Sequence, residues 1–387
     1  MGDKFDNRGL NHGLPMEEEL PVNLLAGIFR DKSQSYKLFW FQAIVEAVCT
    51  GKTAMDYDYI LNQMISKAWY MVIEYHLNLG PSDAIEILIK ELSQKFSLMA
   101  AEKNQNIISF LMNTQEQCIK EAKRKLALNV PYRLQSPFLG QLTESEWRNY
   151  DYVASLTRQN ERVLYYYERL NNNKKHIHIN GRWVSYIIKN EAILKGWIQN
   201  ELIQYLQKRN PNVPGIPFKL KPPEKRDLKI AIKFWNTVIS HYEITDVYTG
   251  NIINEESISK YGKIAIDHFM PWSYVASDEM WNLTPTFASI NSSKSNYLPG
   301  RKSDKDNLAR QQFMVKHMAS ENKNIGKLYE TFKKKHINGT DIEDRLYNKQ
   351  NNEKEFDRIL GNIITPIYIS ANNMGFKDWE KRNYEVI

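Results

Sequence analysis

The sequence predicts a mainly α-helical multidomain protein with a small segment of two strands and one helix embedded in its C-terminal half. Three observations lead to this prediction. The chain has 387 residues, more than one compact core usually holds. Apolar residues recur at spacings of three and four through most of the chain, which is typical of helices with one buried face. Residues 241–305 break this pattern with short strand-like stretches.

The first 140 residues fit an extended lead-in followed by a helical domain. Residues 1–20 are polar and acidic, and we expect them to be extended. Helical spacing is nearly continuous from 21 to 140, and Asp83 stands where it can cap one of the helices. Pro131, Pro137 and Gly140 are expected to end this run.

Residues 141–240 are predicted to be a basic helical region that contains one short hairpin and a linker. Residues 143–170 have helical spacing, and the next stretch predicts a hairpin with Asn180-Gly181 as its type I′ turn. Residues 210–223 hold five prolines and are predicted to be a linker. The mixed segment, 241–305, follows, and residues 306–387 are predicted to be a C-terminal helical region.

Composition narrows the class of protein. Hydrophobic residues make up 42% of the chain and aromatic residues 12%, which favours packed structure over disorder. No stretch of about 20 apolar residues exists, so no transmembrane helix and no membrane partner are expected. Only Cys49 and Cys118 occur, which excludes a disulfide scaffold and a four-thiolate zinc site. We therefore expect a cytoplasmic protein with reduced thiols.

Positive charge is concentrated on both sides of residues 241–299. Residues 161–240 contain 15 Lys and Arg against 6 Asp and Glu, and residues 300–336 contain 10 against 4. The first 80 residues instead contain 7 basic against 10 acidic side chains. A polyanion partner such as nucleic acid would explain this distribution, although lysine-rich helix faces in water give the same pattern.

Residues 248–299 contain the pattern that points to chemistry. They read YTGNII, then a polar stretch, then KIAIDHFMPWSYVASDEMWNLTPTFASINSSKSNYLP. Adjacent residues on a strand point to opposite faces, so Asp267 and His268 would face different sides of their strand. Two strands and a helix can bring Asp267 and Asn291 to one point. A carboxylate and an amide oxygen are hard ligands that suit Mg²⁺ or Mn²⁺.

With Asp267-His268, Asn282, Asn291 and Lys294 in this order, residues 246–300 resemble the HNH (ββα-metal) endonuclease superfamily in its Asp-His…Asn…Asn form. The resemblance covers about a seventh of the chain. It implies a metal-dependent endonuclease that hydrolyses phosphodiester bonds in nucleic acid, with DNA as the expected substrate. This form occurs in bacterial restriction-like nucleases, so a role in restriction or antiphage defence is implied by analogy alone.

The resemblance and the chemistry together suggest a role for each residue. Asp267 and Asn291 would hold Mg²⁺ or Mn²⁺, and His268, whose neutral imidazole is available at pH 7, would be the general base. Asn282 would orient the site, and Lys294 would contact the scissile phosphate or a neighbouring one. The candidates for binding nucleic acid are Lys219, Lys221, Lys225, Arg226, Arg301 and Lys302.

Two features set the chain apart from many HNH nucleases. Many members carry Cys-x-x-Cys pairs around the motif that bind structural zinc, whereas no cysteine lies near it here, so no structural zinc is expected. Ser295 stands where some members place a further histidine ligand, which favours Mg²⁺ over a zinc-type site. The ββα core would then be held by packing alone, through apolar residues such as Tyr248, Trp281 and Phe287.

Asp-His pairs before a proline also occur by chance, so alternatives stay open at this point. The chain could be a non-catalytic nucleic-acid-binding or interaction protein that keeps the fold. The N-terminal helical domain could instead bind a protein partner that gates the nuclease, because its acidic balance suits protein contact better than DNA contact. Double-strand cutting from one site per chain would favour a homodimer.

Overall fold

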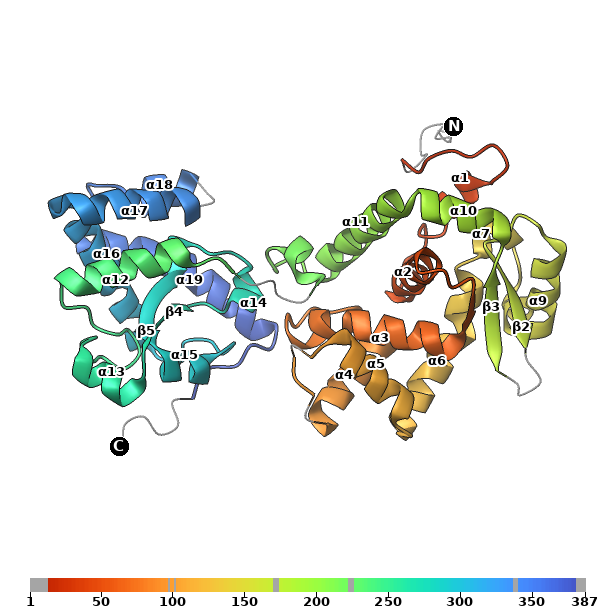
Figure 1. Cartoon of the computed structure of the whole chain (residues 1–387), viewed down its shortest axis with the longest axis horizontal. Coiled ribbons are helices and arrows are strands. Elements are labelled where there is room, and N and C mark those ends of the chain that lie inside the picture. Colours follow the sequence, from red (N-terminus) through yellow and green to blue (C-terminus); the bar gives the residue numbers. More distant parts are fainter. Residues whose placement is uncertain are drawn as a thin grey trace, which may run out of the picture. The chain divides into compact units, whose positions relative to one another are not determined.

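The chain divides into two compact units, residues 1–211 and 212–387 (Figure 1). The computed structural model describes residues 13–96, 98–100, 102–169, 174–221, 226–336 and 340–380, so most of the extended segment expected at 1–20 lies outside them. Both units are mainly helical, as the sequence predicts. No helix in the described ranges is long and apolar enough to cross a membrane. The division of the sequence into five regions stays a prediction.

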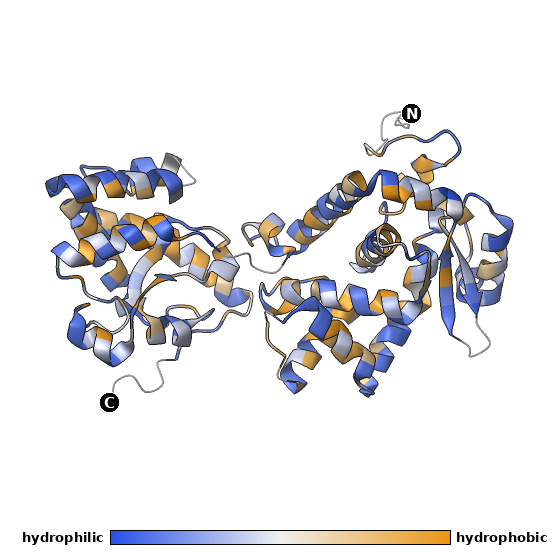
Figure 2. Ribbon diagram, viewed as in Figure 1, coloured by the Kyte–Doolittle hydropathy of each residue, from blue (hydrophilic) through white to orange (hydrophobic). Residues whose placement is uncertain are grey.

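The first unit is built around α2 and α3, which pack against each other and bury the indoles of Trp40 and Trp69. Figure 2 shows apolar and polar residues alternating along most of the helices, because a helix at the surface turns one face to the core. The helices are α1 (Val22–Ala26), α2 (Tyr36–Cys49), α3 (Tyr57–Ile73), α4 (Ala84–Lys95), α5 (Asn104–Asn113), α6 (Gln117–Arg133), α7 (Ser136–Leu139), α8 (Glu144–Arg148), α9 (Tyr150–Gln159), α10 (Gly181–Lys189) and α11 (Glu191–Arg209). As predicted, Asp83 caps α4, accepting from Ile85 N at 2.9 Å.

A three-stranded antiparallel sheet completes this unit and corrects two predictions. Its strands are β1 (Ala54–Asp56), β2 (Tyr165–Arg169) and β3 (Lys175–Ile179), in the order β1-β3-β2. The helix predicted to reach residue 170 is wrong at its end, because residues 165–169 form β2. Tyr165 and Tyr167 point inward at strand spacing, and both hydroxyls donate to the carbonyl of Pro131. The predicted end of the helical run at Pro131 is also wrong, since α6 continues to Arg133.

Asn180 is a helix cap and not the first residue of a hairpin turn. Its side chain accepts a hydrogen bond from Arg182 N at 3.2 Å, and α10 begins at Gly181. The hairpin predicted at 176–184 is therefore wrong in its turn and second strand, while residues 176–179 do form a strand, β3, which pairs with β1 and β2 instead. The buried side chains of Trp183, Tyr186 and Ile187 explain the outcome, because they share one face of a helix and could not share one face of a strand.

The second unit places a two-stranded sheet between helices. In Figure 1, α12 and α15 lie on either side of β4 and β5, and both helices contact both strands. α16 packs against α17 and α19. The elements are η1 (Ile216–Lys219), α12 (Lys229–His241), α13 (Glu255–Tyr261), β4 (Ile264–His268), α14 (Trp272–Val275), η2 (Met280–Asn282), β5 (Leu283–Phe287), α15 (Ala288–Lys294), α16 (Lys302–Glu321), α17 (Lys323–His336), α18 (Thr340–Arg345) and α19 (Glu353–Asn373).

The part of the predicted linker that belongs to the second unit, residues 212–221 as described, packs against that unit. Gly215 has a φ of 64°, and a Cβ placed on it would lie 2.8 Å from the Cβ of Ala276, so this close approach requires glycine. Lys219 has no exposed surface, and its Nζ donates to the carbonyl of Tyr274. The expected contact between Lys219 and nucleic acid is therefore wrong, since the ammonium group is enclosed within the unit.

Candidate active site

The predicted ββα arrangement is present in the second unit. β4 and β5 are antiparallel, with Asp267 opposite Thr284 and His268 opposite Leu283. α15 begins directly after β5 and packs against both strands. Asp267 and His268 thus lie at the end of a strand, beside the helix that carries Asn291 and Lys294.

Asp267 is a buried carboxylate with two strong partners on one of its oxygens. The hydroxyl of Tyr248 donates to Oδ2, and the ammonium of Lys294 lies 3.0 Å from the same atom. Tyr248 is held in turn by stacking on Phe269, with ring centroids 6.1 Å apart. In the described part of the chain, Oδ1 of Asp267 has no hydrogen-bond partner.

His268 is buried and bonded at both ring nitrogens. Nε2 lies 2.7 Å from Oδ1 of Asp278, and Nδ1 lies 3.3 Å from NH1 of Arg226. Because a guanidinium can only donate, Nδ1 is the acceptor, and the proton of the neutral ring sits on Nε2 and is donated to Asp278. Burial lowers the pKa of His268, while the hydrogen bond to Asp278 opposes this shift. The ring is therefore predominantly neutral at pH 7.

Lys294 does not face an approaching phosphate. Its side chain has no exposed surface, and besides the pair with Asp267 its Nζ donates to the carbonyl of His268 at 2.7 Å. The expectation that Lys294 contacts the scissile phosphate is therefore wrong. The next residue, Ser295, is exposed beyond the helix end, with a φ of 43°.

Asn282 joins the two ends of the loop between the strands. Its Oδ1 accepts from the backbone N of Met270 at 2.6 Å, and its Nδ2 donates to the carbonyl of Met270 at 2.9 Å. The carbonyl of Asn282 accepts from Phe269 N at 2.8 Å. These three hydrogen bonds fix the chain just after His268.

Asn291 lies on α15 with its side chain half-buried, and it makes no side-chain hydrogen bond within the described residues. The free Oδ1 of Asp267 and the Asn291 amide are hard oxygen donors, which fits Mg²⁺ or Mn²⁺. Among the described residues, no three His, Cys, Asp or Glu side chains gather as metal ligands. A cation here would therefore depend on one carboxylate and one amide, with water or phosphate oxygens completing its coordination.

Polar contacts, and not packing alone, hold the ββα core. Asp246 lies two residues before Tyr248, and its carboxylate accepts from both the backbone N and the hydroxyl of Thr249, at 2.7 and 2.6 Å. From α16, Gln311 donates to the carbonyl of Thr245 and accepts from the hydroxyl of Thr284. The expectation of packing alone is therefore wrong.

The basic candidates differ in their surroundings. Arg226 contacts His268 and also lies over the ring of Trp272, 5.1 Å from its centroid. Lys221, Arg301 and Lys302 are exposed, the last at the start of α16. Lys225 lies outside the described residues.

Two functional contacts were not predicted from the sequence. Asp278 lies in the loop after α14 and fixes the tautomer of His268. Tyr248 was expected only to pack, yet its hydroxyl holds Asp267. The signal for Asp278, an acidic residue ten positions after the histidine, is too common in loops to be recognised. Asp267 lies on a strand that the sequence predicts, and a carboxylate buried there needs a hydrogen-bond donor. That need is the signal that could have indicated the tyrosine.

Comparison with known proteins agrees with this geometry. Residues 246–300 match the family model described as HNH endonuclease. The matched segment begins at Asp246 and contains both strands and α15, and with them Asp267, His268, Asp278, Asn282, Asn291 and Lys294, whereas Arg226 precedes it. Searches of curated proteins and of solved structures gave no match to the chain.

Proposed function

We propose that this chain, which residues 246–300 place in the HNH endonuclease superfamily, is a metal-dependent endonuclease that cleaves DNA. The proposal rests on one observation: a buried carboxylate, Asp267, stands next to a neutral histidine, His268, whose tautomer is fixed by Asp278. The two residues are adjacent on β4, and Asn291 extends the oxygen-donor set from α15.

His268 is the proposed general base. With its proton on Nε2 and donated to Asp278, the ring presents Nδ1 as the atom that takes a proton from a water molecule attacking phosphorus. Asp278 then stabilises the imidazolium that forms. By resemblance to the family, the products carry a 5′-phosphate and a 3′-hydroxyl.

Asp267 and Asn291 would hold the metal ion. Bound there, Mg²⁺ or Mn²⁺ would supply positive charge that stabilises the developing charge on the phosphate and the leaving oxygen. Tyr248 and Lys294 orient the carboxylate through its other oxygen, so the carboxylate does not have to reorient when the ion binds.

Arg226 has a proposed role in exposing the base. Its guanidinium donates to Nδ1 of His268, the atom that must accept the proton. A phosphate is a stronger acceptor than a neutral imidazole, so substrate would draw Arg226 away from the ring and leave Nδ1 free. The residue would then contact the backbone of the nucleic acid, as the sequence predicts.

The direct test is a cleavage assay with wild type, His268→Ala and His241→Ala. Plasmid DNA, single-stranded DNA and RNA are each incubated with Mg²⁺, Mn²⁺ or EDTA. We expect wild type and His241→Ala to cleave DNA with either metal and to be inactive in EDTA. Loss of a general base should lower the rate of His268→Ala by about 10²- to 10⁴-fold.

The exposed His241 makes this comparison a matched one, because it lies in the same unit and outside the site. Equal cleavage by wild type and His268→Ala would rule out His268 as the base. Binding of DNA without cleavage under any condition would favour a non-catalytic or gated protein. Faster cleavage of RNA than of DNA would contradict the proposed substrate.

The proposed biological role is restriction or antiphage defence, and it rests on analogy with other HNH proteins. It is tested by plating phages on bacteria that produce wild type or His268→Ala protein. Fewer plaques with wild type alone would support the role. Equal plaque counts for a broad panel of phages would contradict it.

A further inference from the structure

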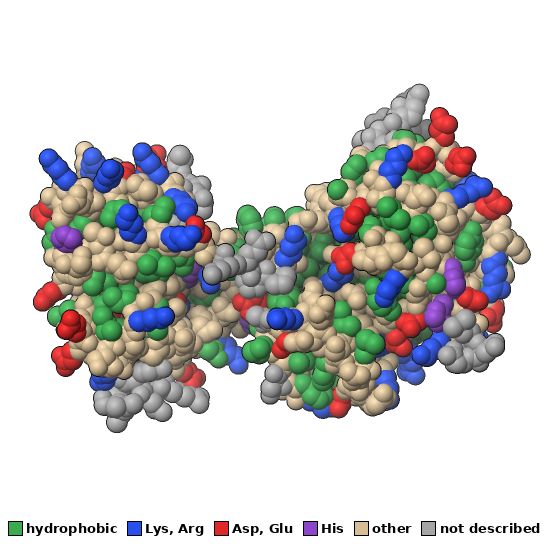
Figure 3. Space-filling view, viewed as in Figure 1, with side chains coloured by type: hydrophobic (Ala, Val, Ile, Leu, Met, Phe, Trp, Pro, Cys, Tyr) green, Lys and Arg blue, Asp and Glu red, His purple; other side chains and the backbone are tan. Residues whose placement is uncertain are grey.

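A pocket of about 640 Å³ lies in the second unit, away from the residues of the nuclease site. It is formed by α16, α17 and residues 347–351, a part of the molecule where Figure 3 shows Lys and Arg side chains gathered over α17 and α18. Its size falls within the range of pockets that bind small molecules, and inorganic phosphate would fill only a fraction of it.

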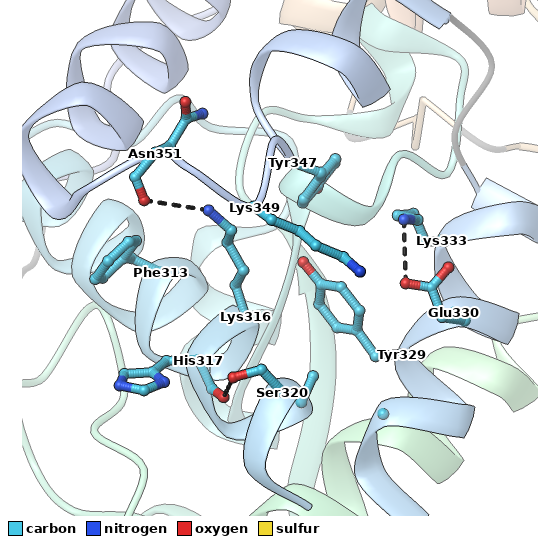
Figure 4. A pocket seen from close by; sticks show the side chains of 12 residues that line it. Phe313, Lys316, His317, Ser320, Tyr329, Glu330, Lys333, Tyr347, Lys349 and Asn351 are labelled. Atoms are coloured by element: carbon cyan, nitrogen blue, oxygen red, sulfur yellow. Dashed lines mark hydrogen bonds and ion pairs between the residues drawn. The ribbon is translucent and has the colours of Figure 1, made fainter. Parts of the chain in front are cut away.

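Two buried tyrosines in the pocket wall have hydroxyls without partners. Tyr329 and Tyr347 are each 6% exposed, and within the described residues neither hydroxyl has a hydrogen-bond partner. Figure 4 shows the Tyr329 hydroxyl pointing into the space between Lys316 and Lys349. A buried hydroxyl without a partner is costly, so these groups point to a ligand that supplies one.

The lining is positively charged. Lys316, Lys333 and Lys349 face a single acidic side chain, Glu330. Lys333 pairs with Glu330 at 3.1 Å and with Glu343 at 3.4 Å, and Lys316 donates to the carbonyls of Asn348 and Asn351 at 2.6 and 3.3 Å. In the described part of the unit, Lys349 has no ion-pair partner and is exposed. The pocket therefore suits an anion, with Lys349 as its first charged contact.

The remaining wall is apolar and suits a flat organic group. Phe313 and Ala319 lie on α16, and the rings of Tyr329 and Tyr347 meet edge to face with centroids 6.3 Å apart. Aromatic faces of this kind stack well on a nucleobase. A strand of nucleic acid is disfavoured as the occupant, because the two hydroxyls lie too deep for a backbone that runs along the surface.

We propose that this pocket binds a nucleoside phosphate, with the phosphate held by Lys349 and the Tyr329 hydroxyl and the base placed against the aromatic wall. The same helix that lines the pocket also supports the nuclease site. Gln312, next to Phe313 on α16, donates to the carbonyls of Met280 and Leu283, which bracket Asn282. A ligand in the pocket thus contacts a helix that holds the catalytic loop.

The test is isothermal titration of the full chain carrying His268→Ala, in EDTA, with the ribonucleoside monophosphates and triphosphates, adenosine, inorganic phosphate and an eight-nucleotide single strand as probes. Because this protein lacks the proposed base, binding does not depend on the proposed nuclease activity, and either proposal can fail alone. We expect one-to-one binding of at least one nucleotide, and weaker binding of its nucleoside and of inorganic phosphate.

Two variants and one control locate the site. Lys349→Ala and Tyr329→Phe should each weaken nucleotide binding by about tenfold, the loss of one hydrogen bond to a charged group. Tyr329→Phe removes only an unpartnered hydroxyl, so the fold should not suffer. Lys327→Ala, an exposed lysine of α17 outside the pocket, should bind as the parent does.

Three results would overturn the proposal. They are the absence of binding by every nucleotide at millimolar concentration, unchanged affinity in both pocket variants, and Lys349-dependent binding of the oligonucleotide when no mononucleotide binds. The last result would assign the pocket to a substrate strand.

Discussion

Asp267 is buried against a lysine, and this pairing sets the electrostatics of the site. A buried carboxylate without a compensating charge is costly, and here the Lys294 ammonium at 3.0 Å supplies that charge. A divalent cation that binds the free Oδ1 adds further positive charge next to the same ammonium. We therefore expect Lys294 to stabilise the protein without metal and, although it orients the carboxylate, to weaken the binding of a metal ion by charge repulsion.

Replacing Lys294 by methionine should consequently strengthen the binding of metal. The variant should be less stable than wild type in EDTA, by about 3 kcal/mol, because Asp267 loses its partner. Adding Mg²⁺ should then raise its melting temperature by about 3 °C or more beyond the rise in wild type. Thermal unfolding with and without Mg²⁺ measures both effects.

The double variant Asp267→Asn, Lys294→Met is the control for this experiment, since it lacks the carboxylate. Its melting temperature should not respond to Mg²⁺. Equal Mg²⁺ responses in the single and double variants would contradict a metal site at Asp267.

Lys219 makes the stability of the second unit depend on pH. Burial lowers its pKa from 10.5 to about 7 in the folded chain. Between these values the unfolded chain binds more protons than the folded one, so stability should rise with pH, by up to about 1.4 kcal/mol per unit. Relative to Lys219→Met, wild type should gain about 2 kcal/mol between pH 7.5 and 9.5.

Urea unfolding of both proteins at several pH values measures this difference. A stability difference that stays constant from pH 7.5 to 9.5 would show that Lys219 titrates normally. The comparison removes the other titrating groups, because they are common to both proteins.

The roles of some of these residues could be predicted from the sequence and those of others could not, because only some depend on local spacing. Asp267, His268 and Asn282 belong to a local motif whose spacing can be read. The partners of Lys219 and Arg226 lie 55 and 42 positions further along the chain, so their burial and contacts depend on the tertiary fold. The same holds for Lys294, since a lysine one turn after Asn291 looks equally suited to an exposed and to a buried role.

At the scale of elements, the loop between β4 and β5 determines whether His268 is correctly placed. Asn282 ties both ends of this loop through Met270, and Gln312 holds the same loop from α16. Asn282 has no exposed surface, so water cannot replace the bonds that its side chain makes.

Asn282→Ala should therefore destabilise the second unit by about 2–4 kcal/mol, because two backbone groups of Met270 lose their partners in the interior. Cleavage should fall as well, since the loop carries Asp278. Urea unfolding and the cleavage rate measure the two effects, with Ser292→Ala on the exposed side of α15 as a control. Stability equal to that of the control would show that the loop is held without Asn282.

The sequence predicts most helices of the structure well, and it fails where two periodicities compete. The spacing that predicts α4 and α12 reflects one buried face over three or more turns, whereas α2 and α3 lie in the core and are buried around most of their circumference. Residues 165–169 are too few to separate helix from strand, and their pairing with β3 and packing against α9 select the strand. Asn180-Gly181 suits a turn and a helix start equally well, so the residues after it decide.

At the scale of the whole molecule, the exposed basic residues of the second unit are the proposed contacts to nucleic acid. Lys221, Arg301 and Lys302 are exposed, whereas Lys219 is excluded by its burial. Charges that contact phosphates release counterions on binding, which makes the affinity depend on salt concentration.

Reversing Lys221, Arg301 and Lys302 to glutamate should weaken DNA binding and flatten its salt dependence. The slope of log affinity against log salt is negative, and it should become less steep by about 0.9 for every phosphate that the variant no longer neutralises. Fluorescence anisotropy over a range of salt concentrations measures the slope. The matched control reverses Lys52, Lys103 and Lys208, which are exposed in the first unit. The same slope for the variant and wild type would show that the three charges are only solvated.

We propose above all that Asp267 and Asn291 hold one metal ion beside His268. It is tested most directly by the rate of DNA cleavage as a function of Mg²⁺ concentration, for wild type and for Asn291→Ala. We predict that the variant requires at least about tenfold more Mg²⁺ for half-maximal cleavage, since the loss of one ligand weakens the site. An activation curve for Asn291→Ala that coincides with that of wild type would contradict the claim.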